Sequence, residues 1–179
     1  MERRVAKMNI SSAGGTASTG SKTCKVTLPT SWAEAMGLDE NHRELELAFD
    51  GTSITLSRRL DGSEFAAQQS ARGHEVRVLR LYDGDTLCST IYADFTGQAL
   101  AVENQAVPLV KTAFGNNQLP TWEDFQRFLE ERCIPRRRAG LREYLEALGL
   151  EEYDPLAIIE KTGGRMAEDQ QWLTLEVLK

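Results

Sequence analysis

Residues 25–38 form the segment that most restricts the fold of this chain. The first four residues alternate between polar and apolar side chains, the pattern of a half-buried strand. Pro29 ends that strand because proline has no N–H for a sheet ladder. Thr30 or Ser31 can cap a helix by accepting a backbone N–H bond, and Gly37 suits the left-handed residue after the last helical turn. The segment therefore predicts a strand, a short helix and a glycine stop.

A β-hairpin is predicted directly after this helix. Residues 44–49 and 53–57 alternate between apolar and polar side chains, and Asp50-Gly51 lies between them. Asp-Gly between two alternating segments is a strong hairpin signal. A piece of about 60 residues buries only about 60% of its unfolded surface, so it is marginal as a monomer. Pairing of two such pieces would supply the missing core.

The three segments VTLPTSWAEAMGL, ELELAFDG and SITLSRR follow one another in the order of one known family. This order resembles the AbrB/MazE/SpoVT family of swapped-hairpin DNA-binding domains, over roughly residues 3–59. The resemblance implies that two chains interleave their hairpins into one barrel, which makes the protein a homodimer. It also implies that basic residues near the first strand face double-stranded DNA. The long insert at residues 11–21 departs from the family, which usually has a tight turn there.

Seven basic residues are the candidates for this DNA face. Contacts from Lys and Arg to phosphates position a protein on DNA without reading its sequence. Hydroxyl groups in the insert, from Thr16, Ser18, Thr19 and Ser21, could add hydrogen bonds to phosphates. The alternative is that the basic residues are ordinary solvated charges. The seven residues are Arg3, Arg4, Lys7, Lys22, Lys25, Arg58 and Arg59.

The net charge of −6 is unevenly distributed along the 179 residues. Residues 1–60 hold eight Lys or Arg against seven Asp or Glu, whereas residues 61–179 hold thirteen against twenty, a charge of −7. Phosphate attraction depends on the surface that docks, so a local basic face can still bind DNA. The acidic second part is expected to bind a basic protein partner, or simply to keep the chain soluble.

No cofactor, metal or membrane span is expected. The glycine-rich insert does not match the phosphate-loop pattern, because Lys22 follows Gly20 one position too late and a strand follows the insert. Cys24, Cys88 and Cys133 form no metal-ligand spacing and are expected to be free thiols in a reducing cytoplasm. The chain has no long apolar run and no secretory signal at its N-terminus. With two histidines and no nucleotide loop, the protein is not expected to be an enzyme.

The second part of the chain is predicted to be a small α+β domain over residues 74–179. Residues 61–73 are small and polar and are predicted to be a linker. Residues 75–82, 87–93 and 99–102 then predict an antiparallel sheet of three strands. The fold class is therefore α+β, with a swapped-hairpin barrel at residues 1–60 and a C-terminal domain of a sheet and three helices.

Three helices and a possible last strand are predicted in the C-terminal third. Thr121 caps the first helix, with Asp124 in a near capping box. The second runs from about Arg136 to Leu148, and Asp154-Pro155 opens the third. Residues 172–177 are a possible strand. The aromatic stripe at Trp122, Phe125, Phe128 and Tyr144 is interpreted as core rather than as a platform for bases.

Eight charged residues of this domain are candidates for binding a protein. Three consecutive arginines at a helix start oppose the helix dipole, so they suit capture of phosphate or partner carboxylates unless nearby glutamates neutralise them. The carboxylates that follow would offer a negative face. The residues are Arg136, Arg137, Arg138, Glu143, Glu146, Glu151, Glu152 and Asp154.

Two functions are consistent with this organisation. The first is a non-enzymatic, dimeric DNA-binding regulator or antitoxin of a bacterial mobile element, whose C-terminal domain binds another protein such as a toxin. The second rests on a looser likeness: in size and layout the whole chain is similar to phage and mobile-element anti-CRISPR proteins directed at type II CRISPR nucleases. Such nucleases hold nucleic acid in positively charged channels, which an acidic domain could occupy.

Overall fold

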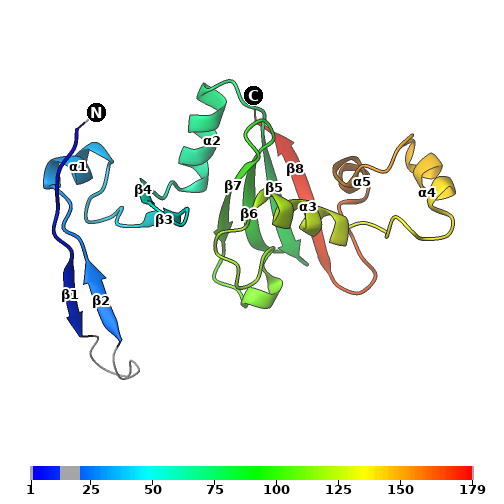
Figure 1. Ribbon diagram of the computed structural model, residues 1–179. Helices are drawn as coiled ribbons and strands as arrows, with labels where there is room; N and C mark the ends of the chain where they lie inside the picture. The colour runs from blue at the N-terminus through cyan, green and yellow to red at the C-terminus, as the bar shows by residue number, and fades with distance from the viewer. Residues whose placement is uncertain (1, 13–20, 179) are drawn as a thin grey trace. The chain divides into compact units, whose positions relative to one another are not determined.

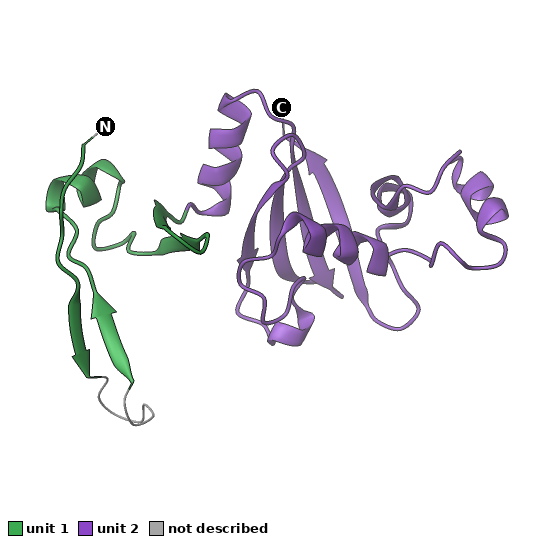
Figure 2. Cartoon of the chain, viewed as in Figure 1, with its two compact units in different colours: residues 1–59 green, residues 60–179 purple. Residues whose placement is uncertain are grey.

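The computed structural model describes residues 2–12 and 21–178, and the chain divides into two compact units (Figure 1). Unit 1 comprises residues 1–59 and unit 2 residues 60–179 (Figure 2). The boundary lies one residue from the predicted end of the first domain. The glycine-rich insert, with its rejected phosphate loop and the hydroxyls of Thr16, Ser18 and Thr19, lies outside the described residues.

Unit 1 consists of two antiparallel hairpins with a short helix between them. The first hairpin pairs β1 with β2, and the second pairs β3 with β4. The described residues of the single chain form no closed barrel. The elements of unit 1 are β1 (Asn9–Ser12), β2 (Lys22–Lys25), α1 (Thr30–Ala35), β3 (Leu45–Phe49) and β4 (Ile54–Arg58).

The first predicted strand is wrong in position. β2 ends at Lys25, where the predicted strand begins, because its ladder partner β1 starts at Asn9, opposite Lys25. The alternation at residues 25–28 is the side-chain pattern of a strand. It does not show whether a second strand lies beside these residues to form hydrogen bonds with them. The strand therefore precedes Pro29 by several residues instead of ending at it.

Helix α1 is present, but its cap differs from the prediction. Its N-cap is Pro29, which has extended backbone angles and makes no side-chain cap bond, so neither Thr30 nor Ser31 is the cap. The carbonyl of Pro29 accepts the N–H groups of Trp32 and Ala33. Gly37 has a φ of +72°, which confirms the left-handed glycine after the helix.

The second hairpin is confirmed, with Asp50 and Gly51 in its turn. The Asp50 carboxylate accepts N–H bonds from Thr52 and Ser53 at 2.9 and 2.8 Å, as well as bonds from both hydroxyls. The hydrogen bonds from Ser53 and Thr52 hold the pKa of Asp50 far below its usual value. Asp50 thus fixes the turn through its own side chain.

Unit 2 is built on one antiparallel sheet with the strand order β7-β6-β5-β8. The sheet has four strands rather than the three predicted, because the last strand of the chain returns to pair with β5, with Leu173 opposite Leu81. The strands are β5 (Val76–Asp83), β6 (Thr86–Asp94), β7 (Ala99–Asn104) and β8 (Gln171–Val177).

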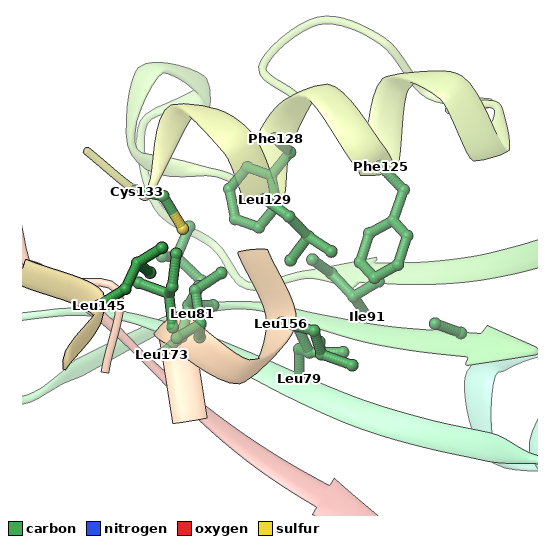
Figure 3. Close-up of a cluster of buried hydrophobic side chains, with 13 residues drawn as sticks. Leu79, Leu81, Ile91, Phe125, Phe128, Leu129, Cys133, Leu145, Leu156 and Leu173 are labelled. Carbon is green, nitrogen blue, oxygen red and sulfur yellow. The ribbon is translucent and has the colours of Figure 1, made fainter. Parts of the chain in front are cut away.

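Helices cover one face of this sheet and enclose the main core. The capping box between Thr121 and Asp124 at the start of α3 is confirmed. Figure 3 shows α3 laying Phe125, Phe128 and Leu129 over the sheet residues of the cluster. Phe125 is fully buried, and its interpretation as core is confirmed. The helical elements here are η1 (Leu109–Lys111), α3 (Trp122–Glu131), α4 (Leu141–Leu148) and α5 (Pro155–Thr162).

The predicted linker at residues 61–73 is instead helix α2 (Gly62–Ala71). Its Phe65 and Ala66 are buried, and Gly62 lies so close to Tyr92 that an added Cβ would come within 2.0 Å of the ring. The N–H of Gly62 donates to Glu103 at 2.7 Å. Neighbouring residues of a strand point to opposite faces of the sheet. Ile91 belongs to the core beneath α3, and the next residue, Tyr92, contacts α2, so α2 packs on the sheet face opposite to α3. Small residues here permit close packing rather than flexibility.

The second predicted C-terminal helix starts five residues later than expected. Gly140, at a φ of +78°, is the N-cap of α4, so Arg136–Arg138 lie in the preceding turn and not at a helix start. The first and third predicted helices, α3 and α5, are confirmed. Unit 2 is therefore α+β, and so is the chain as a whole.

Within residues 2–12 and 21–178, no helix is long and apolar enough to cross a bilayer.

Candidate nucleic-acid interface

Charge in unit 1 is divided between its two hairpins. The segment 2–28, which contains β1 and β2, carries Arg3, Arg4, Lys7, Lys22 and Lys25 against Glu2 alone, a net charge of +4. The segment 29–59 carries a net charge of −3, from Arg43, Arg58 and Arg59 against Glu34, Asp39, Glu40, Glu44, Glu46 and Asp50. The overall charge of +1 is therefore the sum of a strongly cationic segment, which includes the first hairpin, and an acidic one.

The two lysines of this hairpin lie at the two ends of β2. Lys22 is opposite Ser12 and Lys25 is opposite Asn9, and both lysines are exposed. Since they are three residues apart in a strand, their side chains leave opposite faces of the ribbon. Lys25 therefore shares its face with Asn9, and Lys22 shares its face with Ser12. A two-stranded ribbon of this width fits the major groove of B-DNA.

Three further cations precede the hairpin. Arg3, Arg4 and Lys7 lie in an extended segment before β1, and all three are exposed. The carboxylate of Glu2 accepts a hydrogen bond from the indole of Trp32 at 2.6 Å. The acidic group nearest in sequence is thus engaged by α1, and the arginines beside it stay accessible to an anionic partner.

Arg58 and Arg59 belong to the second hairpin rather than to this cationic group. Arg58 ends β4, half-buried, where Gly37 leaves space for its side chain. The Nη1 of Arg59 lies 3.1 Å from the carboxylate of Glu44, and its N–H donates to the carbonyl of the same residue. Arg59 is thus neutralised within the hairpin. Five of the seven predicted DNA-face residues lie in the segment 2–28, and these two lie outside it.

The second hairpin has two exposed apolar cross-strand pairs on one face, next to the pair of Leu45 with Arg58. Leu47 faces Leu56 and Phe49 faces Ile54 on the same side of the ribbon. Leu47 and Phe49 are 63% and 70% exposed. Among the described residues of unit 1, none is buried. A hairpin with such a surface is not stable by itself in water.

The predicted protein-binding residues of unit 2 are distributed along the chain from the α3–α4 turn to α5. Arg136 lies 2.9 Å from Glu130 and stacks on the Tyr153 ring at 4.3 Å. Asp154 is the N-cap of α5 and accepts the N–H of Leu156. Arg137, Arg138, Glu143, Glu151 and Glu152 are exposed, and Glu146 pairs with Arg142 at 3.0 Å.

Two constellations in unit 2 were not found by sequence reasoning. The Nδ1 of His74 lies 2.7 Å from Asp94, which is 1% exposed and also accepts the N–H groups of Thr96 and Gly97. Burial disfavours the charged form of Asp94, but the bonds from Gly97 and His74 outweigh it and lower its pKa. Twenty residues separate His74 from Asp94, so only the β5–β6 pairing brings them together.

The second constellation is a cleft at one side of α3. Trp122 packs against the core, as the sequence predicted, but it is only half-buried and also lines this cleft together with Phe95 and Arg77. Its helical position indicated an apolar face but not that this face also lines a cleft. Within the described parts of the chain, no three His, Cys, Asp or Glu side chains gather as a metal site.

Comparison with protein-family models, with curated proteins and with solved structures found no match to this chain.

Proposed function

We propose that this chain is a non-enzymatic regulatory protein in which unit 1 binds double-stranded DNA as a homodimer and unit 2 binds another protein. The observation that carries the proposal is the division of unit 1 into a cationic hairpin and an apolar hairpin. The first suits phosphate and the second suits a second copy of the same chain. The resemblance to swapped-hairpin DNA-binding domains points in the same direction.

The cationic hairpin supports DNA as the ligand of unit 1. Lys22 and Lys25 project from opposite faces of a ribbon whose other residues are uncharged: Asn9 and Ser12 are polar, and Ile10 is an exposed apolar side chain. A ribbon inserted into a groove meets a phosphate strand on each side, so cations on both faces are useful there. A dimer would bring two copies of the segment 2–28, with a summed charge of +8, to the duplex.

The apolar hairpin supports self-association. Burying a side chain such as Leu47 or Phe49 stabilises by about 1.5–3 kcal/mol when it leaves water completely. A symmetric dimer buries the same surface twice, and each copy supplies an identical apolar ribbon to the other. The described part of unit 1 has no buried residue, which supports the proposal that association completes its core.

Sedimentation and DNA titration test this function together. The full-length protein should sediment as a dimer at micromolar concentration and bind a 20-base-pair duplex in a salt-dependent manner. Leu47→Glu places a charge in the apolar surface and should give monomers that bind DNA at least tenfold more weakly. Val110→Glu, at an apolar residue of unit 2 that is even more exposed than Leu47, is the control and should change neither property. A wild-type monomer, or a dimer that does not retain duplex DNA, would contradict the proposal.

A second candidate function is inhibition of a type II CRISPR nuclease. It is favoured by the charge of −7 after residue 60 and by the exposed carboxylates Glu143, Glu151 and Glu152. Electrostatic steering toward a cationic nucleic-acid channel would weaken as salt rises. Glu151→Lys with Glu152→Lys should then slow association with the nuclease–guide complex and leave DNA binding by unit 1 unchanged. Normal cleavage by that nuclease in the presence of excess protein would exclude this function.

A further inference from the structure

The cleft beside α3 in unit 2 has a volume of about 610 Å³ and an aromatic floor. Phe95, Trp122 and Phe125 pack on one another with ring centroids 5.1 to 6.0 Å apart. Leu129 and Leu156 extend the apolar lining from α3 to α5. Sites that receive a ligand usually measure about 300–1,000 Å³ and combine such a lining with a few polar groups.

Three arginines stand around this floor, and each is held in place. The guanidinium of Arg77 stacks over Phe95 at 4.9 Å, and that of Arg136 stacks over Tyr153 at 4.3 Å. Arg127 lies 3.2 Å from Asp124 on its own helix. Aromatic rings and arginines of this kind are the side chains that contribute most to binding at protein interfaces.

Carboxylates nevertheless outnumber the guanidinium groups at this cleft. Glu75 lies 2.7 Å from Arg77, and Glu130 lies 2.9 Å from Arg136, so these arginines are already neutralised. The lining holds four carboxylates against three guanidinium groups, which leaves an excess of one negative charge. The four are Glu75, Glu123, Glu130 and Asp154, and two carboxylates outside the lining, Asp124 and Glu160, also pair with its arginines.

We propose that this cleft binds a segment of a partner polypeptide that inserts one bulky apolar side chain onto the Trp122 and Phe95 rings and carries Lys or Arg on either side of it. The apolar side chain fits the floor, and the basic flanks complement the carboxylates of the lining, which outnumber its arginines. The inference rests on the proposed protein-binding role of unit 2. It moves the docking surface from the exposed acidic residues around α4 to the groove between α3 and α5.

Selection from a random dodecapeptide library on the full-length protein tests the chemistry of the occupant. The expected consensus is a Trp, Phe or Leu with Lys or Arg within two positions on each side. A synthetic peptide of that consensus should lose at least tenfold in affinity when the apolar residue becomes Ala, and several-fold when the basic residues become Ala. Selection of no peptide family, of acidic peptides, or of peptides without an apolar anchor would overturn the proposal.

Nuclear magnetic resonance can locate the bound peptide on the wild-type protein, without any substitution. The protein has three tryptophans, so its nitrogen–proton spectrum contains three indole signals. Addition of the consensus peptide should move the signal of Trp122 and leave those of Trp32 and Trp172 in place. The indole of Trp172 donates to the carbonyl of Gly84 at 2.7 Å, outside the cleft, which makes it an internal control. An unmoved Trp122 signal at saturating peptide would refute the assignment.

Variants then separate this inference from the proposed function. Trp122→Ala should weaken peptide binding at least tenfold, Trp122→Phe should restore most of it, and Val110→Ala should leave it unchanged. Failure of unit 1 to dimerise or bind DNA would contradict the proposed function and leave these peptide results intact. Conversely, a protein partner whose binding depends on Glu151 and Glu152 but not on Trp122 would agree with the proposed function of unit 2. It would contradict the proposal that the cleft is the binding site.

Discussion

Removal of Lys22 and Lys25 should change the salt dependence of DNA binding by a calculable amount. Each phosphate neutralised by a cation contributes about −0.9 to the slope of log K against log salt concentration. If both lysines contact phosphates, Lys22→Ala with Lys25→Ala should make the slope shallower by about 2 per chain, or about 4 per dimer. Full engagement of the five cations in segment 2–28 would set a wild-type slope of about −9 per dimer.

Fluorescence anisotropy of a labelled 20-base-pair duplex, titrated at four salt concentrations, measures both slopes. The affinity of the double variant should fall by a similar factor on unrelated sequences, because phosphate contacts do not read bases. The control is Arg43→Ala with Lys161→Ala, which also removes two exposed positive charges but outside the first hairpin. Two results would refute the cationic hairpin as the DNA face. One is the same salt slope for wild type and the lysine variant, and the other is a change of slope in the control variant as large as that in the lysine variant.

Two predictions concern the stability of unit 2. Phe125→Ala removes a fully buried ring and should lower the free energy of unfolding by about 3–5 kcal/mol, measured by urea denaturation, with no change in the dimerisation of unit 1. Asp94 has a pKa lowered by Gly97 and His74, so it stabilises the fold above the unfolded pKa of about 3.9 and loses that effect as pH falls through the folded value. The difference in unfolding free energy between wild type and Asp94→Asn should therefore stay constant down to about pH 4 and narrow as the pH falls further; a difference that stays constant at lower pH would contradict this reasoning.

Local chemistry predicted the elements whose causes lie close together in the sequence. The Asp50-Gly51 turn and the capping box of Thr121 and Asp124 depend on contacts across three residues, and both are present. The left-handed Gly37 belongs to the same group. Each of these features can be derived from neighbouring residues without knowledge of the rest of the fold.

Elements defined by distant partners were misplaced. The strand expected at residues 25–28 lies at Lys22–Lys25, because its position is set by pairing with β1 across the insert. Helix α2 was mistaken for a linker, since only Phe65 gives it a large apolar anchor and its small residues are explained by the close approach to Tyr92. The fourth strand of the sheet depends on pairing across about 90 residues.

The candidate site was predicted in part for the same reason. Basic residues are visible as a cluster in the sequence, and five of them lie in one segment of the structure. The separation of Arg59 through its ion pair with Glu44, and the aromatic cleft around Trp122, depend on side-chain contacts between different elements. No spacing rule along the chain could have provided those contacts.

The missing core of unit 1 has a consequence for how the protein would respond to its own abundance. If a second copy completes that core, the folded DNA-binding form appears in proportion to the square of chain concentration when the chain is scarce. The fraction of DNA sites that are occupied would then rise more steeply than the concentration of the chain. A modest fall in synthesis would release the site early, and the released chains would expose Leu47 and Phe49 to cellular proteases.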